Sequence, residues 1–295
     1  MLAKEAWVSC NICGGNAFEE LSLVDKWHIG RCGSCSLIYL NPMPFFAPSA
    51  EFSAMSMGFQ YTQFQHKLTA SVLEHDSKQV RGQFSRLAQL GGPAVKTGRF
   101  LDVGCGSGAS VRAAHDLGWE AVGVDIDPSL VELGREELQV DLRCSPLLEA
   151  GLEANQFHFI RLRDVIEHLP NPSEVLREVS RLLCPGGVVL IATPNEEGLL
   201  NEARHFLGVR RTTVATVAPP HHVHGFTPKT LDLILKKVGF EVLQVKTTTP
   251  VDPLYATARQ MEHDGKPHVA VWRLAKLLGR GSMLVGWGRK PNLNA

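Results

Sequence analysis

The sequence predicts an α/β fold built on a doubly wound, mostly parallel sheet. From residue 99 onward, short apolar runs alternate with amphipathic runs of helical periodicity. This pattern is typical of parallel sheets covered by helices on both faces. The first apolar run ends in the glycine-rich turn "GCGSG", which precedes a helical run. Because ligands of such sheets bind beyond the carboxyl ends of the strands, this turn marks the expected binding edge.

The expected elements follow one another in regular order. Strands are expected at 99–104, 120–126, 157–162, 187–193, 240–248 and 282–290. Helices are expected at 109–118, 128–138, 171–183 and 227–239, the last with Thr227 as its N-cap. We interpret 196–218 either as a lid over the substrate or as an amphipathic helix with a solvated basic end. Segment 267–280 is expected to be a packing helix, with a homodimer contact as the alternative.

The composition is that of a globular protein without a dedicated nucleic-acid surface. The 295 residues are 44% hydrophobic, and 30 Lys plus Arg balance 30 Asp plus Glu, whereas nucleic-acid binders usually carry a basic excess. No apolar run reaches the roughly 18 residues of a membrane span, and the first residues lack the apolar core of a signal peptide. We therefore expect a cytoplasmic protein with no membrane span and no nucleic-acid partner.

Four of the seven cysteines form a metal-site pattern. They stand as C-x2-C-x18-C-x2-C, at Cys10, Cys13, Cys32 and Cys35, a spacing that matches zinc sites. Four thiolates complete a tetrahedron and leave no open position, so we expect structural Zn²⁺. The alternative is four free thiols or two disulfides.

The chain divides into three parts at the sequence level. Residues 1–40 are expected to form a zinc-ribbon module, which is too small to fold without its metal. Residues 41–98 are expected to contain an irregular linker at 41–48, where three prolines fall close together, and one or two helices within 61–90. Residues 99–295 are expected to form the main domain.

Two classes of ligand use a turn like the one formed by Gly104, Gly106 and Gly108. Glycine adopts positive φ readily and lets a ligand lie against the backbone. Dinucleotides and S-adenosylmethionine are both bound in this way, and Gly104-x-Gly106-x-x-Ala109 also fits the dinucleotide fingerprint. The glycines alone do not decide between the two.

Two aspartates narrow the choice. Asp102, at the strand end, would repel a pyrophosphate and attract the ammonium of a methionine moiety. Asp125 closes the second strand, where a carboxylate binds ribose hydroxyls of either cofactor. Together they favour S-adenosylmethionine over NAD.

Five motifs in order resemble the class I S-adenosylmethionine-dependent methyltransferases, which have a Rossmann-like seven-stranded sheet. They are "LDVGCGSG", "GVDIDP", "DVIEHLPNP", "LLCPGGVVLIATPN" and "PPHHVHGFTPKTLDLILKKVGFEV". The subgroup they are most similar to is the ubiquinone-biosynthesis-like small-molecule enzymes. "CGSCSLIYLNPMP" also resembles the zinc-ribbon leader of some bacterial members. The resemblance implies a methionine and ribose side formed by Asp102, Gly104, Cys105, Gly106 and Gly108. It further implies that Asp125 binds the ribose, Ile126 lies on the adenine, and Asp164 lies beside the sulfonium.

Acidic and imidazole side chains gather in two motifs near this edge. "DVIEHL" places Asp164, Glu167 and His168 at i, i+3 and i+4, on one face if the segment is helical. "PPHHVHGF" places His222 and His224 on a loop, on the same side if it is extended. The candidate catalytic residues are therefore His222, His224, His168 and Glu167, unless the histidines only pack locally.

Two versions of the chemistry stay open. In one, a divalent cation is bound at Asp164, Glu167 and His168 with a later histidine, because some related O-methyltransferases resemble this arrangement. In the other, His222 or His224 is the general base, and Glu167 and His168 hold the loop. We favour the metal-free version, because most methyltransferases of this fold need no cation and Asp164 is shorter than the glutamate in those relatives.

The expected function is methyl transfer to a small-molecule metabolite by O- or C-methylation. One alternative is the same chemistry on RNA or protein through the zinc module, and the balanced charge counts against it. A non-catalytic binding protein on this fold is disfavoured by the intact glycine turn and acids. A dinucleotide oxidoreductase is disfavoured by Asp102.

Overall fold

A computed structural model of the chain describes residues 4–45, 68–93, 97–199, 214, 216–249, 252, 254–255, 274–275 and 277–292. Its main sheet contains the strands β6 (Arg99–Val103), β7 (Glu120–Asp125), β8 (Asp141–Cys144), β9 (Phe157–Arg163), β10 (Leu183–Pro194), β12 (Glu241–Thr248) and β13 (Met283–Arg289). The strand order is β12-β13-β10-β9-β6-β7-β8. Only β13 runs antiparallel to its neighbours in this sheet. The predicted mostly parallel, seven-stranded sheet is confirmed.

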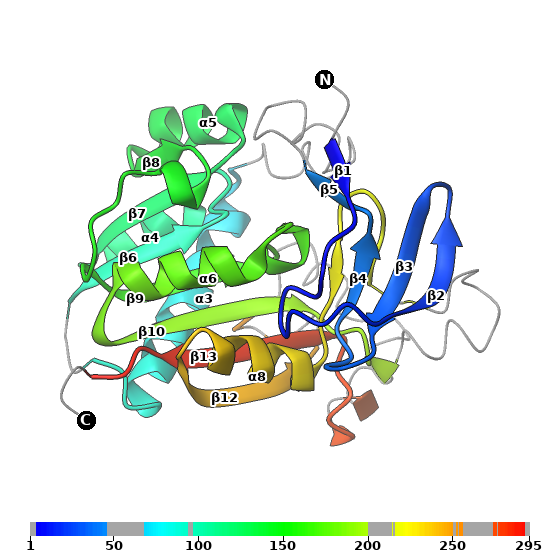
Figure 1. Ribbon diagram of the computed structural model, residues 1–295. Coiled ribbons are helices and arrows are strands. Elements are labelled where there is room, and N and C mark those ends of the chain that lie inside the picture. The colour runs from blue at the N-terminus through cyan, green and yellow to red at the C-terminus, as the bar shows by residue number, and fades with distance from the viewer. Residues whose placement is uncertain are drawn as a thin grey trace.

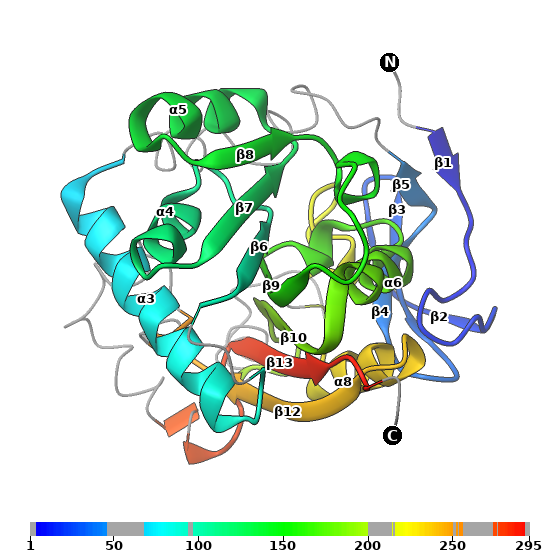
Figure 2. The same ribbon diagram turned by 90° about the vertical axis from the view of Figure 1, so that its left-hand side faces the viewer.

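Helices cover both faces of this sheet, as the alternating pattern predicts. Helices α3 (Ala70–Gln89), α4 (Ala109–Asp116) and α5 (Pro128–Leu138) lie on one face, and α6 (Pro172–Leu182) and α8 (Pro228–Lys237) lie on the other (Figure 2). Thr227 and Thr230 form a reciprocal capping box at the start of α8. Among the described residues, no helix has the length and apolar character needed to cross a membrane.

The N-terminal module adds a second sheet beside one end of the main one. Strands β2 (Phe18–Val24), β3 (Trp27–Cys32) and β4 (Ile38–Asn41) pair antiparallel, and the two-residue strand β11 (His224–Gly225) from the main domain pairs with β4. Figure 1 shows the yellow β11 segment alongside the blue module. Buried apolar residues of the module, such as Ile29 and Leu40, belong to the same continuous core as Phe226 and Ile234.

Two expectations, one about the segment 41–48 and one about the set of strands, were wrong. The segment 41–48 was expected to be irregular, but Asn41 ends β4, and β5 (Met43–Phe45) pairs with β1 (Lys4–Ala6). Pro44 is tolerated there because this is a two-stranded edge ribbon, where a missing N–H costs little. The list of expected strands also lacked β8, because its sequence "DLRC" has no apolar run.

Other expectations fall partly or wholly outside the described residues. Of the helical region at 61–90, the structure describes residues 68–90 and places α3 there. Most of the expected lid, 196–218, and most of the expected packing helix, 267–280, lie outside the described residues. The predictions for those two segments stay predictions.

Candidate active site

The glycine turn joins the end of β6 to the start of α4. Gly104, Gly106 and Gly108 have φ angles of 71°, 55° and 78°, a region that side chains rarely adopt. A Cβ on Gly104 would lie 2.4 Å from Cγ2 of Val165, so this glycine also makes room for the segment after β9. The turn presents bare backbone at the carboxyl edge of the sheet. Cys105 lies within it, and burial raises the pKa of its thiol.

Asp125 ends β7 and holds the glycine turn in place. Its Oδ2 accepts a hydrogen bond from the Gly106 amide at 2.7 Å, and its Oδ1 accepts one from the Asp127 amide at 2.9 Å. Because a carboxylate offers about four lone-pair positions, both oxygens keep room for ribose hydroxyls. Ile126 follows and is partly exposed, so an apolar surface stands next to this carboxylate.

Asp102 does not offer the free carboxylate that the sequence argument assumed. Arg161, on the adjacent strand β9, donates from Nε to Oδ1 at 2.8 Å and from Nη2 to Oδ2 at 2.6 Å. The Ser110 hydroxyl also donates to Oδ2. Since Arg161 neutralises Asp102, the electrostatic argument for an ammonium and against a pyrophosphate loses its basis. A direct contact between Asp102 and a cofactor stays a prediction.

Asp164 lies before the helical turn that carries Glu167 and His168, and does not share a helix face with them. Its φ is 53°, so the chain turns before the three-residue 3-10 helix η2 (Ile166–His168) begins. The predicted i, i+3, i+4 face was therefore wrong, because it assumed a continuous α-helix. The Asp164 amide donates to the Ala192 carbonyl at 2.9 Å, which places Asp164 at the carboxyl edge between β9 and β10.

Glu167 has one carboxylate oxygen that is buried without a partner. Its Oε2 accepts a hydrogen bond from the Thr193 hydroxyl at 2.9 Å. Its Oε1 has no hydrogen-bond partner among the described residues. Burial, and after it the charge of Asp164, raises the pKa of Glu167 to about 7. A buried polar atom without a partner is costly, so this oxygen is a candidate ligand-binding atom.

His168 and His222 each have one ring nitrogen next to a backbone carbonyl. Nδ1 of His168 lies 3.0 Å from the His221 carbonyl oxygen, and Nδ1 of His222 lies 2.9 Å from that of Thr216. A carbonyl oxygen only accepts, so each Nδ1 carries the proton and each Nε2 keeps its lone pair. Burial lowers the pKa of both imidazoles, which favours their neutral forms.

Glu167, His168 and His222 therefore form one cluster, which we call the carboxylate–imidazole cluster. One ligand atom from each lies within 4.8 Å of the other two. Asp164 is not a member, although its charge helps to raise the pKa of Glu167 and opposes the lowering of the pKa of both histidines. The candidate cation set Asp164, Glu167 and His168 is thus replaced by Glu167, His168 and His222.

His224 belongs to different surroundings. It pairs with Tyr39 in the β11–β4 ladder, stacks on that ring at 6.5 Å between centroids, and is 1% exposed. Burial lowers its pKa to about 3, and the Leu169 backbone opposes this only in part. The expected common orientation of His222 and His224 assumed a continuous extended segment. In the structure, the His222 ring contacts His168 instead, with 4.6 Å between centroids.

The four N-terminal cysteines converge on one point. The sulfur atoms all lie within 4.8 Å of one another, with Cys10–Cys35 and Cys13–Cys32 both at 3.4 Å. A tetrahedron with Zn–S bonds of about 2.3 Å has S–S separations of about 3.8 Å, so this geometry fits zinc. All seven cysteines are described, and none forms a disulfide.

Sequence reasoning missed two residues that shape the site. Thr193 hydrogen-bonds Glu167, and Arg161 neutralises Asp102. Both carried a signal: Thr193 ends a central strand at the ligand edge, and Arg161 is a charged residue inside an apolar strand run. A charge in such a run needs a buried partner.

Comparisons with known proteins agree with this architecture. Residues 73–245, more than half of the chain, match a methyltransferase-domain family. A ubiquinone biosynthesis O-methyltransferase of Xanthomonas oryzae is 33% identical over 103 residues, covering 33% of this chain and 43% of that protein. One of Ruegeria pomeroyi is 29% identical over 194 residues, covering 61% and 75%. The match thus spans less than half of the Xanthomonas relative.

Solved structures support the fold alone. One is a candidate methyltransferase chain from a Haloferax volcanii complex with the activator Trm112, with TM-score 0.53, 15% identity, and 84% and 100% of the two chains covered. Another is a candidate sarcosine dimethylglycine methyltransferase of Galdieria sulphuraria, with TM-score 0.50, 20% identity, and 72% and 85% covered.

The sheet, the glycine turn and the acid at the end of β7 define a Rossmann-like methyltransferase fold. The chain belongs to the class I S-adenosylmethionine-dependent methyltransferases.

Proposed function

We propose that this protein transfers a methyl group from S-adenosylmethionine to a hydroxyl oxygen of a small molecule. The observation that carries the proposal is the carboxylate–imidazole cluster, which stands after β9 at the same sheet edge as the glycine turn. The names of the Xanthomonas and Ruegeria relatives, which are O-methyltransferases of ubiquinone biosynthesis, support the choice of oxygen and of a small acceptor.

The cofactor is assigned to the edge formed by the glycine turn and Asp125. The bare backbone of Gly104 and Gly106 leaves space for it, Asp125 accepts from the ribose hydroxyls, and Ile126 covers the adenine. Cys105 and Gly108 complete the turn, and Asp164 lies at the end of β9 on the sulfonium side. Asp102 acts through Arg161 and Ser110, which fix the strand end that carries the turn.

A divalent cation is assigned to the carboxylate–imidazole cluster. What supports it is the donor set: the unpartnered Oε1 of Glu167 and two neutral imidazoles whose Nδ1 protons are held by backbone carbonyls. Carbonyl bonds of this kind orient metal-ligating histidines. Three protein ligands leave open positions for an acceptor. This replaces the metal-free version, in which His222 is the general base.

The chemistry at this edge is an in-line displacement. The acceptor oxygen forms a bond to the methyl carbon, the carbon–sulfur bond breaks, sulfur keeps the electron pair, and the hydroxyl proton goes to solvent. A divalent cation held by Glu167, His168 and His222 would orient the hydroxyl and lower its pKa. Thr193 fixes one oxygen of Glu167 by its hydrogen bond, which leaves the other oxygen to bind a cation.

The cysteine cluster is assigned to structural Zn²⁺, because four thiolates leave no position for a substrate. Burial raises the pKa of Cys10 and of Cys35, the latter to about 11, whereas at Cys32 hydrogen bonds from the Cys35 and Ser34 amides outweigh burial and lower the pKa to about 7. Bound Zn²⁺ requires all four as thiolates.

The test is methyl transfer from radiolabelled S-adenosylmethionine to a panel of small hydroxylated compounds. Catechols are included, since two adjacent hydroxyls can occupy two open positions of one cation. We expect product with a catechol, loss of activity after chelation, and recovery with magnesium or manganese. Transfer that survives exhaustive chelation would favour His222 as general base instead, and transfer only to RNA or protein would overturn the small-molecule assignment.

A further inference from the structure

The N-terminal module holds both chain segments that carry the carboxylate–imidazole cluster. The first contact is made by Asn11, which lies inside the first Cys-x-x-Cys turn. Its Nδ2 donates to Oδ1 of Asn171 at 2.8 Å, and its Oδ1 accepts from the Ser173 amide at 2.9 Å. Its backbone carbonyl accepts from the Ser173 hydroxyl at 2.7 Å. Asn171 is the N-cap of α6 and stands three residues after His168.

The second contact runs through Val223, the residue just before strand β11. The Leu40 amide of β4 donates to the Val223 carbonyl at 3.0 Å, and the Val223 amide donates to the Glu167 carbonyl at 2.8 Å. The Val223 residue therefore links the module directly to the backbone of a cluster member. His222, another member, is its neighbour in the chain.

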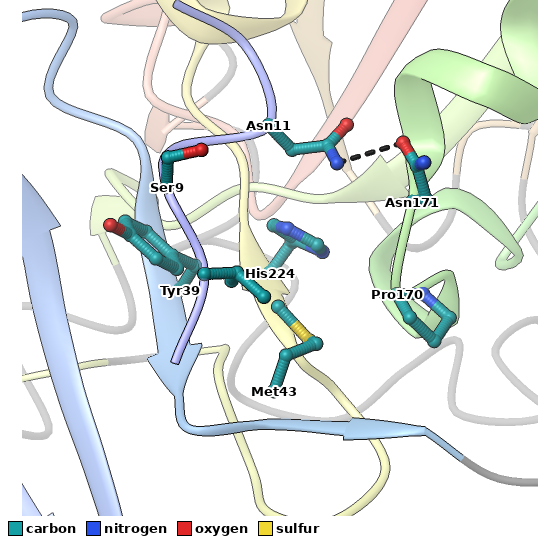
Figure 3. Close-up of a pocket in the computed structure, with 8 residues that line it drawn as sticks. Ser9, Asn11, Tyr39, Met43, Pro170, Asn171 and His224 are labelled. Carbon is teal, nitrogen blue, oxygen red and sulfur yellow. Dashed lines mark hydrogen bonds between the residues drawn. The ribbon is translucent and has the colours of Figure 1, made fainter. Parts of the chain in front are cut away.

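A small cavity of about 180 Å³ lies between module and main domain, lined by Asn11 and Tyr39 of the module and by Asn171 and His224 of the main domain. In Figure 3, Asn11 is hydrogen-bonded to Asn171, and Tyr39 and His224 line the same cavity. Both sides also belong to one buried apolar core. The module is thus packed against the active-site segments and does not stand apart as a separate reader domain.

We propose that the zinc module is a positioning element for the carboxylate–imidazole cluster, with Asn11 and Leu40 as its positioning residues. The cation-binding role of the cluster rests on the proposed function. The structural link between the zinc module and the cluster segments does not depend on it. The η2 helix has only three residues, and a module of this size needs its metal to fold. Loss of zinc therefore releases Asn11 and β4 and loosens the cluster while the glycine turn stays folded.

Two variants of the full-length protein test the coupling. Asn11→Ala removes the side-chain contacts to α6 without touching a cysteine. Asn16→Ala, at an exposed asparagine of the same module, is the matched control. Three quantities are measured: zinc content, Mn²⁺ affinity by calorimetry, and hydrogen exchange of the His168 and Val223 amides. The same three are measured on wild-type protein stripped of zinc by a thiol-reactive mercurial.

The coupling predicts that Asn11→Ala keeps its zinc and loses about tenfold or more in Mn²⁺ affinity, the usual effect of losing a residue that orients metal ligands. Zinc-stripped protein exchanges the His168 and Val223 amides faster and still binds S-adenosylhomocysteine. Asn16→Ala behaves as wild type. Unchanged exchange of both amides in Asn11→Ala and in zinc-stripped protein would overturn the coupling. If wild-type protein binds no Mn²⁺, the cation assignment fails, and the exchange rates alone decide the coupling.

Discussion

Arg161 on β9 and Asp102 on β6 form a two-point ion pair inside the sheet, with N–O distances of 2.8 and 2.6 Å and side-chain exposures of 2% and 1%. The pair fixes the strand end that leads into the glycine turn. Breaking a buried pair leaves the remaining charge without compensation.

Arg161→Met should therefore destabilise the protein by about 3–5 kcal/mol, the usual cost of removing one partner of a buried pair. The matched control is Arg31→Met, since Arg31 is 45% exposed and lies 4.0 Å from Glu19; it should change stability by about 1 kcal/mol or less. Urea unfolding of both variants measures this. An Arg161→Met midpoint equal to that of wild type would show that the pair does not hold the strand end.

Cofactor affinity should depend on the ionisation of Asp125. Burial raises the pKa of Asp125, although the Asp127 and Gly106 amides donate to it. Because folding raises this pKa, the group's contribution to stability is largest at low pH and is lost as pH rises. Ribose hydroxyls need the carboxylate form, so S-adenosylhomocysteine affinity should fall as pH drops from neutral through the raised pKa.

Calorimetry across pH measures this dependence. Asp125→Asn should bind more weakly, by about 1.5–3 kcal/mol, and should lose the pH dependence that Asp125 causes. If Asp125→Asn and wild type share the same pH profile, Asp125 is not the ribose acceptor.

The two histidines of "HHVH" should differ in their effects. His222→Ala should reduce turnover by about 10²-fold or more with little change in cofactor affinity, since it removes a proposed ligand of a cation whose charge stabilisation is worth several kcal/mol. His224→Ala should mainly lower stability, because it removes a buried ring packed against Tyr39 and Phe226. His221→Ala is the matched control. Turnover and thermal unfolding of the three variants test this, and a larger turnover loss in His224→Ala would reverse the assignment.

The protein should contain one zinc per chain, measurable by elemental analysis. Cys32→Ser should lose it, whereas Cys144→Ser, at an exposed cysteine outside the cluster, should keep it. S-adenosylhomocysteine binding should survive in both variants, because the cofactor edge belongs to the main domain. Stoichiometric zinc in Cys32→Ser would refute the ligand set.

The main sheet could be predicted from the sequence because the patterns that mark its strands and helices involve residues close together in the chain. Apolar runs and caps such as Thr227 depend on neighbours in the chain, and the positive φ of Gly104 and Gly106 is what glycine permits. The cysteine cluster was also predictable, since a metal site needs a fixed ligand spacing.

The carboxylate–imidazole cluster could not be predicted from the sequence, because its members come together only in the folded chain. Asp164 fits a helical spacing in the sequence but turns away from it at φ 53°, and no periodicity shows such a turn at a non-glycine residue. Arg161 meets Asp102 only because β9 and β6 are neighbours. The pairing of β11 with the zinc module joins residues about 185 positions apart, and two residues carry too little pattern to predict it.

Binding of a divalent cation by Glu167, His168 and His222 can be measured without the acceptor, by following Mn²⁺ with electron paramagnetic resonance. We predict one Mn²⁺ per chain, displaced by excess Mg²⁺. That binding should be lost in Glu167→Gln and His222→Ala and kept in His115→Ala, a change at an exposed histidine of α4. Wild-type protein that binds no Mn²⁺, or a Glu167→Gln variant that binds it as tightly as wild type, would contradict the cation assignment.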